Sequence, residues 1–328
     1  GSAVSIRSLS IVTVLSLVLT ACGGAPVVEI DNLADVNALN ETQHRLWYAA
    51  DNLDEAIEKR RLVYEDPDLT EYVQSVLDQL YPELVGILHV ELLNSPNLNA
   101  ICLPNGHIYI NIGLLARLDN EAQLATILAH EAAHFVRQHS AQQRNSTDSA
   151  ILVGTSFEVL TGIPFSGTLL ASSVISNYSQ AHENEADTDG FTRLVQAGYN
   201  PREAPKAFDK LLKEVEVLDI DQPFMFASHP KLEHRITHFD GLVADVRNPH
   251  GKVNADDFLQ RTKTLREVTL MRYLDMNNYK VLILILESPV LRQRYTAHPD
   301  YFLGKAYSLR NAEGDGALAM HALTQSIN

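Results

Sequence analysis

The chain has 328 residues but only two cysteines, Cys22 and Cys102, and far fewer basic than acidic side chains. A disulfide within the chain would need both cysteines, so any modification of Cys22 excludes one. Lysine and arginine number 26 against 41 aspartates and glutamates, which gives a formal net charge of −15. Because contacts to phosphates require lysine and arginine, this balance argues against a nucleic-acid partner. The 45% apolar content still suffices for a full core.

Long uninterrupted apolar runs are also lacking. Leu9 to Leu19 follows Arg7 and ends in small residues, so it is too short for a stable membrane span. We interpret it as the apolar part of a secretory signal peptide over residues 1–21. Residues 150–176 are apolar, but an acidic residue, a proline and three glycines interrupt them, which favours packed helices joined by a loop.

The signal peptide ends in Leu19-Thr20-Ala21-Cys22, which resembles a bacterial lipobox over residues 19–22. The resemblance implies that Cys22 is lipidated and becomes the first residue of the mature chain. We therefore expect a periplasmic protein anchored by lipid on Cys22, in the outer membrane because Gly23 and not aspartate follows. The alternative is an ordinary signal peptide with an incidental cysteine. Residues 22–40 are expected to form a flexible tether.

Periodicity divides the rest of the chain into a mixed domain over residues 41–245 and a helical tail over 246–328. Apolar residues at helical spacing predict helices over residues 41–64, from Pro67 to Leu80, and over residues 178–197. Another helix is predicted to start near Asn120. Strands are predicted over residues 89–93 and 107–112, the second preceded by a Pro-Asn-Gly turn. The fold class is therefore α+β, mainly helical.

The tail contains one partial match to a known repeat. Leu303-Gly304-Lys305-Ala306-Tyr307 matches part of the first helix of a tetratricopeptide repeat, but the rest of that repeat matches poorly. A plain helical hairpin explains the segment equally well. Val281 to Leu286 is compatible with either a buried helix or a strand.

A five-residue motif in a strongly helical segment carries the clearest chemical signal. His130 to His134 read His-Glu-Ala-Ala-His, and residues four apart on a helix lie on the same face. His130 and His134 can therefore direct ring nitrogens at one ion, and Zn²⁺ accepts such ligands. Glu131 lies beside them and can take the proton of a water that the metal has acidified.

A catalytic zinc needs a third protein ligand and one open position. Ser140 stands where the HExxHxxGxxH pattern would supply a third histidine. His139, on a continuing helix, would point away from the metal, so we expect it to form hydrogen bonds or to pack.

The better candidates for the third ligand lie fifty residues downstream. Glu183 and Asp187 are one helical turn apart, so Glu183 can be the third ligand while Asp187 braces a ligating histidine. Glu185 is about 200° from Glu183 around the helix and is expected to be dispensable for zinc.

These residues, taken together, resemble the HtpX/BepA-like gluzincin metallopeptidases. The resemblance covers roughly residues 45–245 and extends to Leu103-Pro104-Asn105-Gly106-His107, Gly113-Leu114-Leu115 and Ser228-His229-Pro230. It implies a gluzincin core with a short mixed sheet beside the HExxH helix, and residues 150–176 over the cleft. It also implies an edge strand that binds extended substrate by main-chain pairing, for which Ile108, Tyr109 and Ile110 are the candidates.

The resemblance also points to His229, which matches a family histidine connected with holding the enzyme latent. His229 could occupy the open position of the zinc at rest, or it could stay free and hydrogen-bond the oxyanion. A surface histidine at the start of a helix is the alternative without a function.

We therefore expect a zinc-dependent endopeptidase with one Zn²⁺ per chain. Its expected substrates are polypeptides, namely misfolded or unassembled envelope proteins. The membrane is contacted through the lipid, and the tail is a candidate for binding outer-membrane assembly machinery. The alternative function is a periplasmic assembly chaperone or quality-control factor whose zinc site stays mostly latent.

Overall fold

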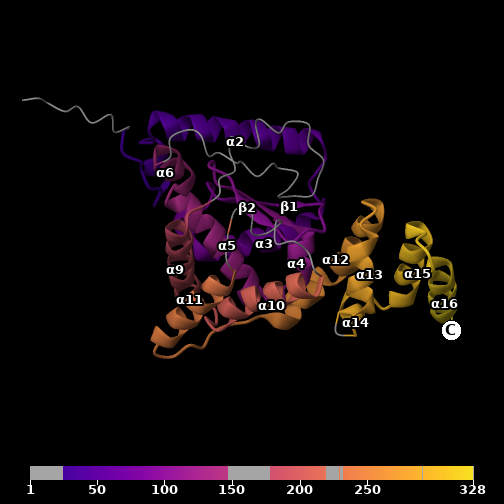
Figure 1. The fold of residues 1–328 in the computed structure, drawn as a ribbon. Helices are drawn as coiled ribbons and strands as arrows, with labels where there is room; N and C mark the ends of the chain where they lie inside the picture. The colour runs from indigo at the N-terminus through magenta and orange to yellow at the C-terminus, as the bar shows by residue number, and fades with distance from the viewer. Residues whose placement is uncertain (1–24, 147–177, 219–228, 230–231, 290, 328) are drawn as a thin grey trace, which may run out of the picture.

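We describe the protein from a computed structural model that places residues 25–146, 178–218, 229, 232–289 and 291–327. Figure 1 shows a mainly helical body around one small sheet, from which further helices extend toward the C-terminus. The predicted α+β, mainly helical class is confirmed. Among the described helices, none is long and apolar enough to cross a membrane.

The sheet has three strands in the order β1-β3-β2. β1 (His89–Leu93) runs parallel to β3 (His107–Asn111), and β2 (Ala100–Cys102) runs antiparallel to it. β1 and β3 match the predicted strands to within a residue. β2 has only three residues, too few for an alternating pattern, and was not predicted.

The prediction that Ile108, Tyr109 and Ile110 form an edge strand is wrong. β3 lies in the middle of the sheet, paired with β1 on one side and with β2 on the other, so its main chain has no free side. Within the described residues, no other strand pairs with the outer side of β2. β2 is therefore a free edge of the sheet, whereas the outer side of β1 is bridged by Val63 at Leu93.

The helix α5 (Glu121–Val136) runs through the centre of the body, and all of its residues are buried. It starts where Asn120 Oδ1 accepts a hydrogen bond from the main chain of Gln123, at 2.9 Å. The elements that pack on α5 include β2, α3 (Pro67–Leu80), α9 (Gln180–Gln196) and α10 (Glu203–Leu218). A short 3-10 turn, η1 (Pro82–Leu84), follows α3. The small alanines of α5 let these elements approach closely.

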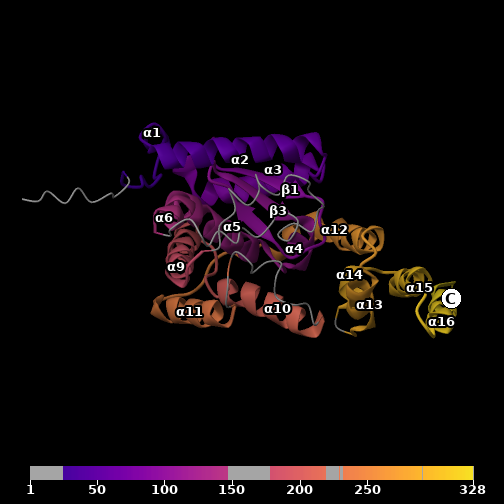
Figure 2. The same ribbon diagram turned by 45° about the horizontal axis from the view of Figure 1, so that its top comes forward.

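The first described residues are packed, so the prediction of a flexible tether is wrong from Val28 onward. Ile30 is fully buried, and its N–H donates to the carbonyl of Val136 at 2.9 Å. The short helix α1 (Leu33–Val36) follows, and then α2 (Glu41–Lys59) covers one face of the sheet (Figure 2). The chain preceding α2 is ordered because its apolar side chains join the core.

The C-terminal part is all helical: after α11 (Leu232–Asp245) come α12 (Ala255–Asp275), α13 (Tyr279–Glu287), α14 (Arg292–Tyr295), α15 (Pro299–Arg310) and α16 (Asp315–Ile327). The ambiguous segment Val281 to Leu286 is therefore helical. α12 joins the two parts, because Phe258 and Leu265 belong to the main core whereas Leu270 belongs to a second core in the tail.

A buried ion pair strengthens this junction. Arg117 ends α4 (Ile112–Arg117), and its Nε donates to Glu214 of α10 at 2.7 Å. Tyr273 of α12 and Tyr295 of α14 surround the same pair. Beyond it, α15 and α16 form a helical hairpin that is closely packed at Gly304, where a Cβ would meet the side chain of Leu323.

Candidate metal centre

The two histidines of the HExxH motif converge inside the protein. His130 and His134 lie one turn apart on α5, each only 2% exposed, and their Nε2 atoms are 3.1 Å from each other. Two ring nitrogens at this distance can share one proton or bind one cation. The rings are therefore oriented toward a common point.

α9 crosses α5 and brings Glu183 to this point. Glu183 is fully buried, with its two carboxylate oxygens 3.5 Å from Nε2 of His134 and 3.6 Å from Nε2 of His130. Oε2 of Glu183 has no hydrogen-bond partner in the described structure. A buried carboxylate oxygen without a hydrogen-bond partner destabilises the fold, so a cation bound at this oxygen would be stabilising.

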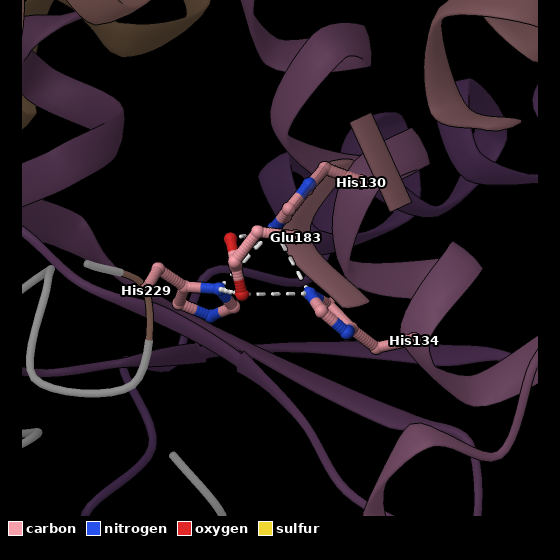
Figure 3. A group of neighbouring side chains, drawn as sticks. All are labelled: His130, His134, Glu183 and His229. Carbon is pink, nitrogen blue, oxygen red and sulfur yellow. Dashed lines mark hydrogen bonds and ion pairs between the residues drawn. The ribbon is translucent and has the colours of Figure 1, made fainter. Parts of the chain in front are cut away.

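His229 is the fourth residue of the group (Figure 3). Its Nδ1 lies 2.9 Å from Oε1 of Glu183 and 3.2 Å from Nε2 of His130, and the residue is buried. One ligand atom from each of His130, His134, Glu183 and His229 lies within 4.8 Å of the other three. The sequence singled out all four residues, and the structure brings them together.

The charges of these groups suit a divalent cation. Burial, reinforced by the neighbouring His130 and His229, lowers the pKa of His134 well below its usual range, so its ring is neutral. Burial alone would raise the pKa of Glu183, but His229, His130 and Arg235 lower it overall. Histidine imidazoles and one carboxylate form the donor set typical of catalytic zinc, and Oε2 of Glu183, which lacks a hydrogen-bond partner, is available to such an ion.

Glu131 lies beside the group without belonging to it. Its carboxylate is nearly buried, and Oε1 lies 3.5 Å from Nε2 of His229. Glu131 also contributes to raising the pKa of the Cys102 thiol, which burial raises most, so β2 runs close to this carboxylate. Glu131 thus lies next to the cluster, on a helix that packs against β2.

Asp187 supports His130 from behind. Its Oδ1 lies 2.8 Å from Nδ1 of His130, the ring nitrogen on the far side from the cluster. Arg235 donates to both oxygens of Asp187, and its positive charge is the main force that lowers the pKa of this carboxyl against the effect of burial. The carboxylate can therefore accept the Nδ1 proton of His130 and leave Nε2 free as a ligand.

His139 forms hydrogen bonds and is not a member of the cluster, as expected, but it does not point away from the site, because the helix does not continue. α5 ends at Val136, Gln138 adopts a left-handed conformation with φ of +54°, and α6 (His139–Ser146) begins in a new direction. The turn places Nδ1 of His139 at 2.8 Å from Nδ1 of His134. Glu185 then contacts His139 at 2.9 Å, a pairing that helical spacing alone could not reveal.

Several predicted features fall outside the described residues. These are Cys22 with the signal peptide, the apolar block over 150–176, and Ser228 and Pro230 on either side of His229. Tyr178, which starts the next described segment, stacks on His134 with ring centroids 3.8 Å apart. No pattern in the sequence predicts this contact.

Comparison with known proteins identifies a peptidase family and two protease relatives. Residues 65–243 match peptidase family M48. The chain is 29% identical over 213 residues to the beta-barrel assembly-enhancing protease of Yersinia pestis, which covers 60% of this chain and 43% of that protein. It is 34% identical over 131 residues to the mitochondrial metalloendopeptidase OMA1 of Arabidopsis thaliana, covering 38% and 26% of the two chains. The chain thus spans under half the length of these relatives.

Proposed function

The chain belongs to peptidase family M48, and from this premise we propose that it is a zinc-dependent endopeptidase. The observation that carries the proposal is the buried convergence of His130, His134 and Glu183, with one oxygen of Glu183 lacking a hydrogen-bond partner. These three residues are the proposed ligands of one Zn²⁺. Two histidines, one carboxylate and an open position suit zinc best among the common divalent metals.

Each residue around the ligands has a proposed role in peptide hydrolysis. When bound, zinc acidifies a water and polarises the substrate carbonyl. Glu131 accepts the proton of the attacking water and returns it to the leaving amine as a general base and acid. Asp187 fixes the ring of His130 through Nδ1, which the contact of 2.8 Å supports.

We further propose that extended substrate pairs with β2. In the antiparallel register, Leu103 donates to His107 and Asn111 donates to Asn99, so alternate residues of β2 face β3. The N–H and C=O groups of Ala100 and Cys102 therefore point away from the sheet. A substrate strand bound there would lie next to Glu131, and this role replaces the one assigned to β3.

His229 is proposed to restrain the enzyme at rest. Its ring lies within the cluster, close enough to complete a four-ligand site of the kind typical of structural zinc. Substrate would then have to displace this ring, which is a shift between two populations. The other role, hydrogen bonding to the oxyanion, predicts the opposite effect of removing the ring.

The proposed substrates are misfolded or unassembled envelope proteins, and the proposed place is the periplasmic face of the outer membrane. The lipobox at Cys22 and the relatives named for beta-barrel assembly support this setting. Intact-mass analysis of membrane-extracted protein would test the anchor by detecting diacylglycerol and acyl groups on Cys22. Loss of membrane partitioning in Cys22→Ala is the expected companion result.

The principal test of the enzyme is metal dependence. Purified protein should digest casein, lose this activity with a chelator, and regain it with one equivalent of Zn²⁺. Digestion that persists after complete metal removal would contradict the proposal. An assembly chaperone is the alternative function, and full rescue of an envelope defect by Glu131→Gln would favour it.

A further inference from the structure

Behind the metal centre, His139 contacts His134 from the side opposite the cluster, and Glu185 in turn contacts His139. His139 is fully buried, and its two ring nitrogens face different partners. Nδ1 lies 2.8 Å from Nδ1 of His134, and Nε2 lies 2.9 Å from Oε2 of Glu185. The three side chains therefore form a continuous row that ends at a proposed metal ligand.

The proton positions in this row follow from chemistry. His134 must keep the lone pair of Nε2 for the cluster, so its single proton lies on Nδ1. Nδ1 of His139 must then accept that proton, which leaves the proton of His139 on Nε2, where Glu185 accepts it. Only this arrangement gives each contact one donor and one acceptor with both rings neutral.

We propose that His139 and Glu185 are positioning residues that hold His134 in its metal-binding tautomer. The proposal rests on the proposed metalloenzyme function and adds two residues to it. His130 and His134 are thereby supported in different ways, because Asp187 contacts His130 directly whereas Glu185 acts on His134 through an intervening imidazole. The intervening ring spans the distance between α9 and the end of α5.

The environment of Glu185 fits this role. Arg137 lies 3.8 Å from its other oxygen, Oε1, and also pairs with Asp189 of the same helix. The side chain of Glu185 is 40% exposed, so water can partly replace it, whereas His139 has no access to water. Removal of His139 should therefore weaken metal binding more than removal of Glu185, which the sequence alone marked as dispensable.

Zinc affinity of the full chain, measured by competition with a chelator, tests the row. His139→Leu removes the acceptor, and the dissociation constant of Zn²⁺ should rise about 10–100-fold, the usual effect of losing such a partner. His139→Asn keeps an acceptor oxygen near the position of Nδ1 and should restore most of the affinity. Glu185→Ala should cost only a few-fold. The control His107→Leu breaks a similar pair, between His107 and Asp54, that includes no residue of the cluster, and it should leave the zinc affinity unchanged.

Nitrogen NMR of histidine-labelled protein gives a second measurement, which shows which ring nitrogen carries the proton. A purely structural role of His139 and Glu185 would not fix these proton positions. The proposal predicts a proton on Nδ1 of His134 and on Nε2 of His139. Equal affinity in His139→Leu and wild type, equal losses in His139→Leu and His139→Asn, or the opposite tautomers would overturn it. A wild-type chain that binds no Zn²⁺ would instead contradict the proposed function, and the tautomers read on that chain would still test the row.

Discussion

Gly190 of α9 lies directly against the backbone of His130. A Cβ at position 190 would come within 2.9 Å of the main-chain nitrogen of His130, closer than real side chains approach. The same helix carries Asp187 and Glu183, about one and two turns before this crossing. The contact therefore sets how far the carboxylates of α9 lie from the histidines of α5.

Gly190→Ala should push α9 away from α5 and damage both stability and the site. We expect a loss of about 1–3 kcal/mol in the free energy of unfolding, as for other overpacked cores, together with weaker zinc binding. Gly241→Ala is the matched control, because it also lies in a helix but a Cβ there meets nothing within 4 Å. Denaturant unfolding and metal titration of both variants check this, and a Gly190→Ala protein indistinguishable from wild type would contradict it.

Glu183→Ala should abolish stoichiometric zinc binding and activity, because it removes the buried carboxylate between His130 and His134. Glu233→Ala removes an exposed carboxylate from α11 and should leave both unchanged. Metal content after dialysis, measured by atomic emission, distinguishes the two variants. Retention of one zinc by Glu183→Ala would place the third ligand elsewhere.

The sequence allowed much of this site to be predicted because its parts lie at fixed helical spacing. His130 and His134, or Glu183 and Asp187, need only an α-helix to face the same way. His139 and the edge strand could not be placed in this manner. The position of His139 depends on where α5 ends, and the edge depends on β2, a strand too short to show a pattern.

His229→Ala separates the two proposed roles of this ring. If His229 restrains the resting enzyme, its removal should raise basal cleavage or self-cleavage while zinc stays bound. If it donates to the oxyanion, the same change should lower kcat by about 10²–10³-fold. Casein digestion and autolysis, followed over time, decide between them. Unchanged turnover, autolysis and zinc affinity would remove both roles.

Cys102→Pro tests the proposed substrate strand. The N–H of Cys102 points away from β3, so proline removes a donor for substrate without breaking the sheet. We expect intact folding and zinc binding, with a higher KM for extended peptides. Ile101→Pro, by contrast, removes a hydrogen bond to β3 and should destabilise the fold. An unchanged KM in Cys102→Pro would exclude pairing at this position.

The most direct measurement compares wild type and Glu131→Gln for zinc content and casein cleavage in the same preparations. Glutamine keeps the shape of the side chain but cannot accept the proton, and Glu131 is not one of the proposed ligands. The account predicts one zinc per chain in both proteins and a fall in cleavage rate of about 10²–10⁴-fold in the variant. Equal cleavage by the two proteins, each with its zinc bound, would contradict it.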